Sequence, residues 1–317
     1  MKIVVLDGGT LRKPLSDWEP VSALGEFVFY QDTPRMDDVI VERIADADIV
    51  LTNKVPLTAS ILQAVPSVKL ISTLATGYNQ VDVACAATQG IVVCNVPAYS
   101  TETVAQHVLA FILHFTNRVT EHADWVRSGA WAESPYFSFW NAEIRELHTL
   151  TVGIIGAGAI GQRVAQLAAA FGAKVLMHSR TPKNIPGVEW VTLEELLARS
   201  DFVSLHCPLT PQTHHLMNAL RFAQMKPGAC LINTSRGDVV ASQDLADALT
   251  TGHLGAAAVD VVSQEPMPAD HPFNGVKNLI VTPHMAWAGE ASLNRLLQIT
   301  EQNIRAFILG SPLHQVN

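Results

Sequence analysis

Three side chains with complementary acid–base chemistry, Arg236, Glu265 and His284, lie in the second half of the chain, each shortly after an apolar segment. A guanidinium can hold a carboxylate through two parallel hydrogen bonds. An imidazole exchanges protons near neutral pH, and a carboxylate can orient it and keep it protonated. Taken singly, Arg236 could be a surface salt-bridge donor, Glu265 a turn residue and His284 a loop cap. The set predicts general acid–base chemistry on a substrate that carries a carboxylate.

A glycine-rich string lies upstream of these residues. Gly156-Ala157-Gly158-Ala159-Ile160-Gly161 follows an apolar segment and opens a helical pattern. In a strand–turn–helix unit, such glycines permit a tight turn, let a pyrophosphate approach the backbone and let the helix pack on the strand. The helix N-terminus then offers unpaired N–H groups to the phosphates. A glycine-rich turn without a ligand is the alternative, and the strand–turn–helix context disfavours it. We therefore predict a dinucleotide site at Gly156, Gly158, Ala159, Ile160 and Gly161.

The end of the next apolar segment bears on the choice between NAD and NADP. An acidic residue there would bind the ribose 2′-hydroxyl of NAD, but residues 174–183 contain no carboxylate. Ser179, Arg180, Thr181 and Lys183 could instead hold a 2′-phosphate, Arg180 through planar charged donors. A solvated basic turn that is neutral to the choice is the alternative. The sequence favours NADP over NAD without excluding NAD.

Alternating apolar segments and helical patterns must position these residues. The alternation predicts parallel sheets covered by helices on both faces, with ligands bound beyond the carboxyl ends of the strands. A long helix from about Ser100 to Ser128 separates two such arrays. The aromatic segment 131–140 is expected to pack against another surface, such as a second subunit. The expected strands are Ile3–Leu6, Phe27–Tyr30, Ile49–Thr52, Leu70–Leu74, Ile91–Val93, Val152–Ile155, Lys174–His178, Phe202–His206, Cys230–Thr234, Ala256–Asp260 and Leu279–Thr282, and the last helix is Gly289–Leu309.

Composition excludes several classes of partner. With 29 acidic and 21 basic residues the net charge is -8, which disfavours nucleic acid and anionic membrane surfaces. We find neither an apolar stretch of membrane-spanning length nor a secretory pattern at the N-terminus. The cysteines, Cys85, Cys94, Cys207 and Cys230, match no metal or redox spacing and are expected to be buried free thiols. These features predict a cytoplasmic protein without a bound metal.

The ordered motifs resemble those of one family. They are the glycine string, His206-Cys207-Pro208-Leu209-Thr210, Asn233-Thr234-Ser235-Arg236-Gly237, Asp260 with Glu265-Pro266, and Thr282-Pro283-His284. Together they resemble the D-isomer-specific 2-hydroxyacid dehydrogenases, and within them the glycerate dehydrogenase/hydroxypyruvate reductase branch, over essentially the whole chain. The resemblance implies a Rossmann-type NAD(P) domain, residues 100–287, inserted into a flavodoxin-like substrate domain, residues 1–99 and 288–317. It also implies a homodimer formed in part by residues 101–145, and reduction of hydroxypyruvate or glyoxylate, or the reverse oxidation.

The resemblance also assigns roles to single residues. Arg236 would bind the substrate carboxylate and polarise the carbonyl, while Glu265 would support His284 as the acid/base. Asp260 would hold the nicotinamide carboxamide. The backbone of Ala75, Thr76 and Gly77 would meet the substrate carboxylate. Further cofactor contacts would come from His206, Cys207, Pro208, Thr213, Thr234, Ser235, Arg236 and His284.

Several positions leave alternatives open. Ser179 stands where the family usually has Asp. Trp287 could narrow the substrate pocket or pack between the domains, and Asn53 could reach a distal substrate hydroxyl or serve as a turn residue. Trp140 could enter the pocket of a neighbouring subunit or join the core. Two other functions remain as rivals, a formate dehydrogenase, which would carry Gln in place of Glu265, and a corepressor-like dinucleotide-sensing protein, which would not need the catalytic set.

Overall fold

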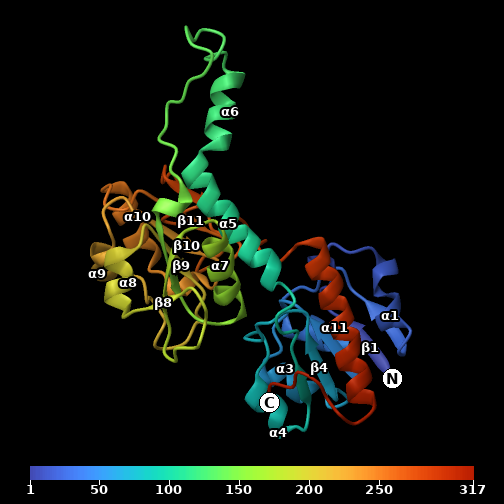
Figure 1. Ribbon diagram of the computed structural model, residues 1–317. Coiled ribbons are helices and arrows are strands. Elements are labelled where there is room, and N and C mark those ends of the chain that lie inside the picture. The colour runs from blue at the N-terminus through green and yellow to red at the C-terminus, as the bar shows by residue number, and fades with distance from the viewer. The chain divides into compact units, whose positions relative to one another are not determined.

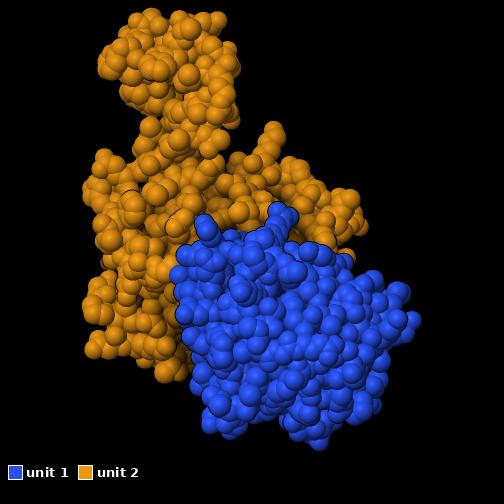
Figure 2. Space-filling view, turned by 90° about the vertical axis from the view of Figure 1, so that its right-hand side faces the viewer, with its two compact units in different colours: residues 1–100, 288–317 blue, residues 101–287 orange.

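The computed structural model describes residues 1–317, which form two compact units. Unit 1 contains residues 1–100 and 288–317, and unit 2 contains residues 101–287 (Figures 1 and 2). None of the helices is both long enough and apolar enough to cross a membrane.

Unit 1 is built on a five-stranded sheet in which every neighbouring pair is parallel. The strand order, β2-β1-β3-β4-β5, is the flavodoxin-like order. The long helix α11 contacts α1 and β4, and its buried residues recur every three or four positions, as expected for a helix with one face on a core. The elements are β1 (Lys2–Val5), α1 (Glu19–Ser22), β2 (Glu26–Phe29), α2 (Asp37–Ile44), β3 (Ile49–Thr52), α3 (Ala59–Ala64), β4 (Leu70–Thr73), α4 (Val83–Thr88), β5 (Val92–Cys94) and α11 (Glu290–Ile308), with 3-10 turns at Gly8–Leu11 and Leu15–Trp18.

Unit 2 carries a seven-stranded parallel sheet of order β12-β11-β10-β9-β6-β7-β8. This is the doubly wound dinucleotide-binding order with one added strand, and the strand order reverses between β6 and β9. The elements are α5 (Thr101–Asn117), α6 (Val119–Arg127), β6 (Thr151–Ile155), α7 (Ala159–Ala170), β7 (Lys174–His178), β8 (Glu189–Trp190), α8 (Leu193–Arg199), β9 (Phe202–Leu205), α9 (Ala219–Gln224), β10 (Cys230–Asn233), α10 (Ser242–Thr250), β11 (Ala256–Val259) and β12 (Leu279–Val281), with 3-10 turns at Leu147–Thr149 and Gly237–Val239.

Each face of this sheet has its own apolar core. Ile154 and Ile232 pack with residues of α5 and α7, whereas Ile155 and Leu231 pack with residues of α8, α9 and α10. Neighbouring residues of one strand therefore enter different cores, because side chains alternate between the two faces of a strand. The prediction of two doubly wound parallel sheets is confirmed, and the expected strands occur within one or two residues of their predicted bounds.

The prediction of one continuous helix from Ser100 to Ser128 is wrong. The chain forms α5 and α6, separated by Arg118, whose φ of 53° lies in the left-handed region. A single left-handed residue ends a right-handed helix because its backbone angles do not continue the helical turn. The prediction of four buried thiols is only half right, since Cys94 and Cys230 are buried but Cys85 and Cys207 are partly exposed.

Helix α6 and the segment that follows it project away from the rest of unit 2 (Figure 1). No residue of α6 is buried, and four aromatic side chains after it are largely exposed: Trp131, Tyr136, Phe137 and Trp140. Trp140 is 68% exposed, so the alternative in which it joins the core of its own chain is wrong. Packing of this arm against a second subunit stays a prediction.

Candidate active site

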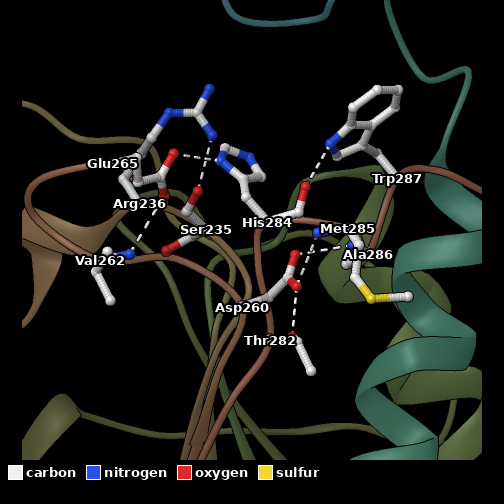
Figure 3. Close-up of polar contacts among 10 residues, drawn as sticks. All are labelled: Ser235, Arg236, Asp260, Val262, Glu265, Thr282, His284, Met285, Ala286 and Trp287. Carbon is white, nitrogen blue, oxygen red and sulfur yellow. Dashed lines mark hydrogen bonds and ion pairs between the residues drawn. The ribbon is translucent and has the colours of Figure 1, made fainter. Parts of the chain in front are cut away.

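The carboxyl ends of β10, β11 and β12 lie next to one another in unit 2. In the sheet register Asn233 pairs with Val259, and Val259 pairs with Val281. Neighbouring strands are about 4.8 Å apart, so the three segments that leave these strands start side by side. These segments carry Arg236, Glu265 and His284 (Figure 3).

His284 and Glu265 form the most direct polar contact of this region. The Nδ1 atom of His284 lies 2.6 Å from Oε2 of Glu265, while Oε1 of Glu265 accepts a hydrogen bond from the backbone N–H of Val262. The carboxylate thereby holds the ring through Nδ1, and Nε2, which makes no hydrogen bond within the chain, is left to face a reactant. Both side chains are accessible, His284 at 25% and Glu265 at 36% exposure. Such a pair suits proton exchange with a bound molecule.

Arg236 is brought to this pair by a close backbone contact. A Cβ atom placed on the neighbouring Gly237 would overlap the carbonyl group of Val262 and the backbone nitrogen of Ser263. Only glycine therefore allows the segment after β10 to lie against the segment that carries Glu265. Figure 3 shows the Arg236 side chain with one Nη atom bonded to the carbonyl oxygen of Ser235 at 2.7 Å.

Asp260 anchors the segment on which His284 lies. Its Oδ1 accepts from the hydroxyl of Thr282 at 2.5 Å and from the N–H of Met285 at 2.9 Å, and its Oδ2 accepts from the N–H of Ala286 at 2.8 Å. The side chain of His107, on α5, lies 3.3 Å from the hydroxyl of Thr282, and burial lowers the pKa of His107 although the nearby carboxylate of Asp260 opposes this shift. The sequence also predicts that Asp260 holds the nicotinamide carboxamide. For that contact Asp260 would use the carboxylate lone pairs that do not accept from these three donors.

The sequence did not point to this anchoring. Thr282 lies two residues before His284 in the motif, so its position was a usable signal, whereas His107 lies far away in sequence and offered none. Trp287 also belongs to the network, because its Nε1 donates to the carbonyl oxygen of His284 at 2.7 Å. His284 has a φ of 50°, and its N–H donates to the carbonyl of Asp260 at 2.8 Å. The indole of Trp287 thus helps to hold a left-handed residue in place.

The glycine string adopts the strand–turn–helix form. Gly156 has a φ of 111°, and a Cβ atom there would lie 2.5 Å from the carbonyl oxygen of His206. A Cβ atom on Gly161 would overlap the carbonyl oxygen of Gly156. Both glycines are therefore required by the packing of the chain itself. Gly158 differs, since a Cβ atom there would meet nothing within 4 Å.

The surroundings of Gly158 fit a dinucleotide phosphate. Gly158 precedes α7, whose first turn has no acidic residue and whose N-terminus has no side-chain cap. A twelve-residue helix therefore presents its first N–H groups and the positive end of its dipole to the open space beside Gly158. At the carboxyl end of β10, two strands from β6 in the sheet order, the hydroxyl of Thr234 is buried without any hydrogen-bond partner. A buried polar atom of this kind needs a partner, which a bound cofactor would supply.

The segment after β9 lies against the glycine turn. The Nε2 atom of His206 bonds the hydroxyl of Ser204 at 2.8 Å, and burial lowers the pKa of His206 to about 4. Burial likewise raises the pKa of the Cys207 thiol. Both side chains are therefore neutral near pH 7, which suits an apolar wall better than a reactive role. The hydroxyl of Thr213 bonds the carbonyl oxygen of Pro208 at 2.6 Å, so it shapes the same loop.

The end of β7 carries cationic side chains without acidic partners. Ser179 donates its hydroxyl to the carbonyl oxygen of Thr181 at 2.8 Å. Arg180, Thr181 and Lys183 are exposed, and neither Arg180 nor Lys183 forms an ion pair. These exposed cationic side chains have no acidic partner in the chain, and their contact with a 2′-phosphate stays a prediction.

In unit 1 the predicted substrate residues lie at the carboxyl ends of β3 and β4. Asn53 is buried at 3% exposure, and its amide nitrogen donates to the hydroxyl of Thr10 at 3.0 Å. The carboxylate of Asp7 accepts the backbone N–H groups of Asn53 and Lys54, and burial raises its pKa. These contacts favour the turn role of Asn53 that the sequence left open.

The loop after β4 leaves backbone donors free. The carbonyl oxygen of Ala75 accepts from Val96, and the hydroxyl of Thr76 donates to the carbonyl oxygen of Val96 at 2.9 Å. The N–H groups of Thr76 and Gly77 donate to no group of the chain. Binding of a carboxylate by this loop stays a prediction.

Three comparisons bear on this geometry. Residues 109–286 match the family model for the D-isomer specific 2-hydroxyacid dehydrogenase, NAD binding domain. The hydroxypyruvate reductase of Blautia hydrogenotrophica is 43% identical to this chain, and the alignment covers 100% of both chains. Among solved structures, an acyclic imino acid reductase in complex with NADPH and D-Arg has a TM-score of 0.88 at 29% identity, over 100% of both chains. A D-lactate dehydrogenase of Aquifex aeolicus, complexed with NAD and lactic acid, has a TM-score of 0.85 at 31% identity, over 98% and 96% of the chains.

Proposed function

This chain belongs to the D-isomer-specific 2-hydroxyacid dehydrogenase family, and on that premise we propose that it reduces hydroxypyruvate to glycerate, or glyoxylate to glycolate, or catalyses the reverse oxidation. The observation that carries the proposal is the 2.6 Å contact between His284 and Glu265, at strand ends next to that of Arg236. The similarity to a hydroxypyruvate reductase over the whole chain supports the choice of substrate.

The side chains divide the chemistry among them. When bound, a reduced nicotinamide supplies the hydride that reaches C2 of the keto acid. Arg236 binds the substrate carboxylate and orients the carbonyl. His284 donates the proton from Nε2 to the carbonyl oxygen, so that the carbonyl group becomes an alcohol, and in the reverse direction it accepts that proton. Glu265 keeps its contact with Nδ1 throughout and stabilises the protonated ring. General acid catalysis of this kind contributes a factor of about 10²–10⁴ in rate.

Substitution of His284 tests the proposal. His284→Ala should lower the turnover of hydroxypyruvate by about 10²–10⁴, with cofactor affinity largely retained. The matched control is His148→Ala, which removes a histidine that also faces a carboxylate, that of Glu146 at 3.2 Å. A His284→Ala enzyme with unchanged turnover would refute the assignment. Reduction of a panel of 2-keto acids, together with a separate assay of formate oxidation, separates the substrates. Formate oxidation needs no proton donor, so the His284–Glu265 pair speaks against formate.

We further propose that the enzyme prefers NADP to NAD. The absence of a carboxylate at the end of β7 and the unpaired Arg180 support this preference. The two solved relatives were determined with different cofactors, NADPH and NAD. Arg180→Ala should lower kcat/KM for NADPH by about 10- to 100-fold and leave NADH nearly unchanged, since a hydrogen bond to a charged group is worth about 1.5–3 kcal/mol. Equal losses for both cofactors would contradict a role with the 2′-phosphate.

A homodimer is the proposed assembly, with the projecting arm as its interface. The support is the exposure of Phe137, at 92%, on an arm that has no buried residue in α6. Phe137→Asp should convert a dimer into a monomer in analytical ultracentrifugation. Leu220→Asp, which alters another exposed apolar side chain of unit 2, is the matched control and should leave the dimer intact. A monomeric wild-type protein would overturn the proposal.

The match to the family model supports the assignment of unit 2 to the cofactor and unit 1 to the substrate.

A further inference from the structure

Two histidines and an aspartate that the proposed mechanism does not use come together on the surface of unit 2. His214 and His215 follow the loop after β9, and Asp238 lies in the 3-10 turn after β10. One ligand atom from each side chain lies within 4.8 Å of the other two. Both histidines are exposed and Asp238 is partly exposed, so a solute can reach all three.

The backbone conformation of His215 creates the histidine pair. Side chains of consecutive residues in extended chain point to opposite sides. His215 instead has a φ of 48°, in the left-handed region, and its ring stacks on that of His214 with centroids 3.9 Å apart and an interplanar angle of 29°. This conformation turns two neighbouring imidazoles toward the same point. Histidine is one of the few residue types that enters this region with some frequency.

The two segments that carry the cluster are fastened to each other. The N–H of His215 donates to the carbonyl oxygen of Asp238 at 2.7 Å, and the N–H of Met217 donates to that of Val239 at 3.0 Å. The preceding turn is closed by the hydroxyl of Thr213, which accepts the N–H of Thr210 at 2.7 Å. The backbone around the three side chains is therefore set before any ligand arrives, and only side-chain rotation is needed.

We propose that His214, His215 and Asp238 form an accessory site for a borderline divalent transition metal, for which Zn²⁺ is the probe. Zn²⁺ binds sets of ligands made of imidazole nitrogens and carboxylate oxygens, such as the two nitrogens and one oxygen here. Mg²⁺ and Ca²⁺ prefer ligand sets made of oxygen alone. Tetrahedral Zn²⁺ with bonds of about 2.0–2.1 Å holds its ligand atoms about 3.3 Å apart. The separations, which are at most 4.8 Å, must therefore shorten by up to about 1.5 Å, and water supplies the fourth ligand on the exposed side.

The sequence alone conceals this site. His214 and His215 are adjacent, which matches no familiar metal-ligand spacing, and Asp238 comes from another strand end. The cluster exists because β9 and β10 are neighbours in the sheet. The expectation of a protein without a metal rested on the spacing of ligand residues along the sequence. That spacing does not reveal ligands that come together only through tertiary contacts.

Zinc binding to the full-length protein tests the proposal without any measurement of activity. After treatment with EDTA and removal of the chelator, Zn²⁺ is titrated calorimetrically into the wild-type protein, His214→Ala, His215→Asn and Asp238→Asn. Asn replaces His215 because it tolerates the left-handed conformation. His148→Ala, an exposed histidine beside Glu146, is the matched control, and His284→Ala accounts for zinc bound at the catalytic pair.

The expected result is one zinc ion per wild-type chain that His148→Ala and His284→Ala retain. Each of the three ligand variants should lose at least tenfold in affinity for that ion, as far less direct changes around metal sites already cost 10- to 100-fold. Zinc should also raise the unfolding temperature of the wild-type protein but not of His214→Ala, because a ligand stabilises only the state that binds it. Absence of binding to the wild type, or wild-type affinity in the ligand variants, overturns the proposal.

Discussion

Gly158 offers a direct way to separate the packing of the glycine turn from its use by a cofactor. Its φ of -72° is one that alanine adopts freely, and an added Cβ atom meets nothing within 4 Å. Gly158→Ala should therefore leave the protein folded, with a free energy of unfolding within about 1 kcal/mol of the wild type, because alanine restricts the unfolded chain but is a poorer N-cap than glycine for α7. The open space that accepts the methyl group is the space in which the phosphates are expected.

The effect on the cofactor follows from the same geometry. A methyl group between the backbone and a phosphate acts as overpacking, which costs about 1–3 kcal/mol. Since 1.4 kcal/mol is a factor of ten, the affinity for NADPH and NADH should fall by about 5- to 150-fold. Gly161→Ala is the contrasting variant, because its Cβ atom would overlap the carbonyl oxygen of Gly156, and it should lose stability before any cofactor is added.

Two assays report the two quantities separately. Thermal or urea unfolding without cofactor measures stability, and fluorescence titration with NADPH measures affinity. If Gly158→Ala bound NADPH as tightly as the wild type, the phosphates would not lie at the start of α7 and the dinucleotide site would have to be placed elsewhere. If the variant were unfolded, the space beside Gly158 would not be open.

Three further predictions concern the region beyond the strand ends. Gly237→Ala would force its segment away from a facing backbone and displace Arg236; steady-state assays should show a loss of turnover of about 100-fold, and an unchanged rate would contradict the reasoning. Asp260→Ala would leave buried N–H groups without their acceptor; urea unfolding should show a loss of about 2–4 kcal/mol, and a loss below 0.5 kcal/mol would be too small. His206 has a pKa lowered to about 4 by burial, from 6.5. Below pH 6.5 the unfolded chain therefore binds a proton that the native chain does not. Stability should fall by up to about 3 kcal/mol between pH 6.5 and 4, and His206→Gln should remove most of that slope.

Much of the fold was determined by the sequence alone. Short apolar segments that alternate with helical patterns predict parallel strands because both signals are local, and the strands occur where they were expected. The glycine string likewise carries its own geometry, since Gly156 must take a positive φ and Gly161 must let the helix approach. Arg236, Glu265 and His284 could be placed at one edge of a sheet because the carboxyl ends of neighbouring parallel strands lie together.

The tertiary structure alone decided the contacts between segments that are distant in the sequence and share no local pattern. The order β12-β11-β10 brings Asp260 to the backbone that carries His284, and it decides that Gly237 lies against Val262. The left-handed conformations of Arg118 and His215 cannot be foreseen from the sequence, because only a few per cent of non-glycine residues adopt them, even though histidine does so more often than most. The conformational preferences of neighbouring residues determine helices, strands and turns. Strand order and a few unusual backbone angles determine which side chains come into contact.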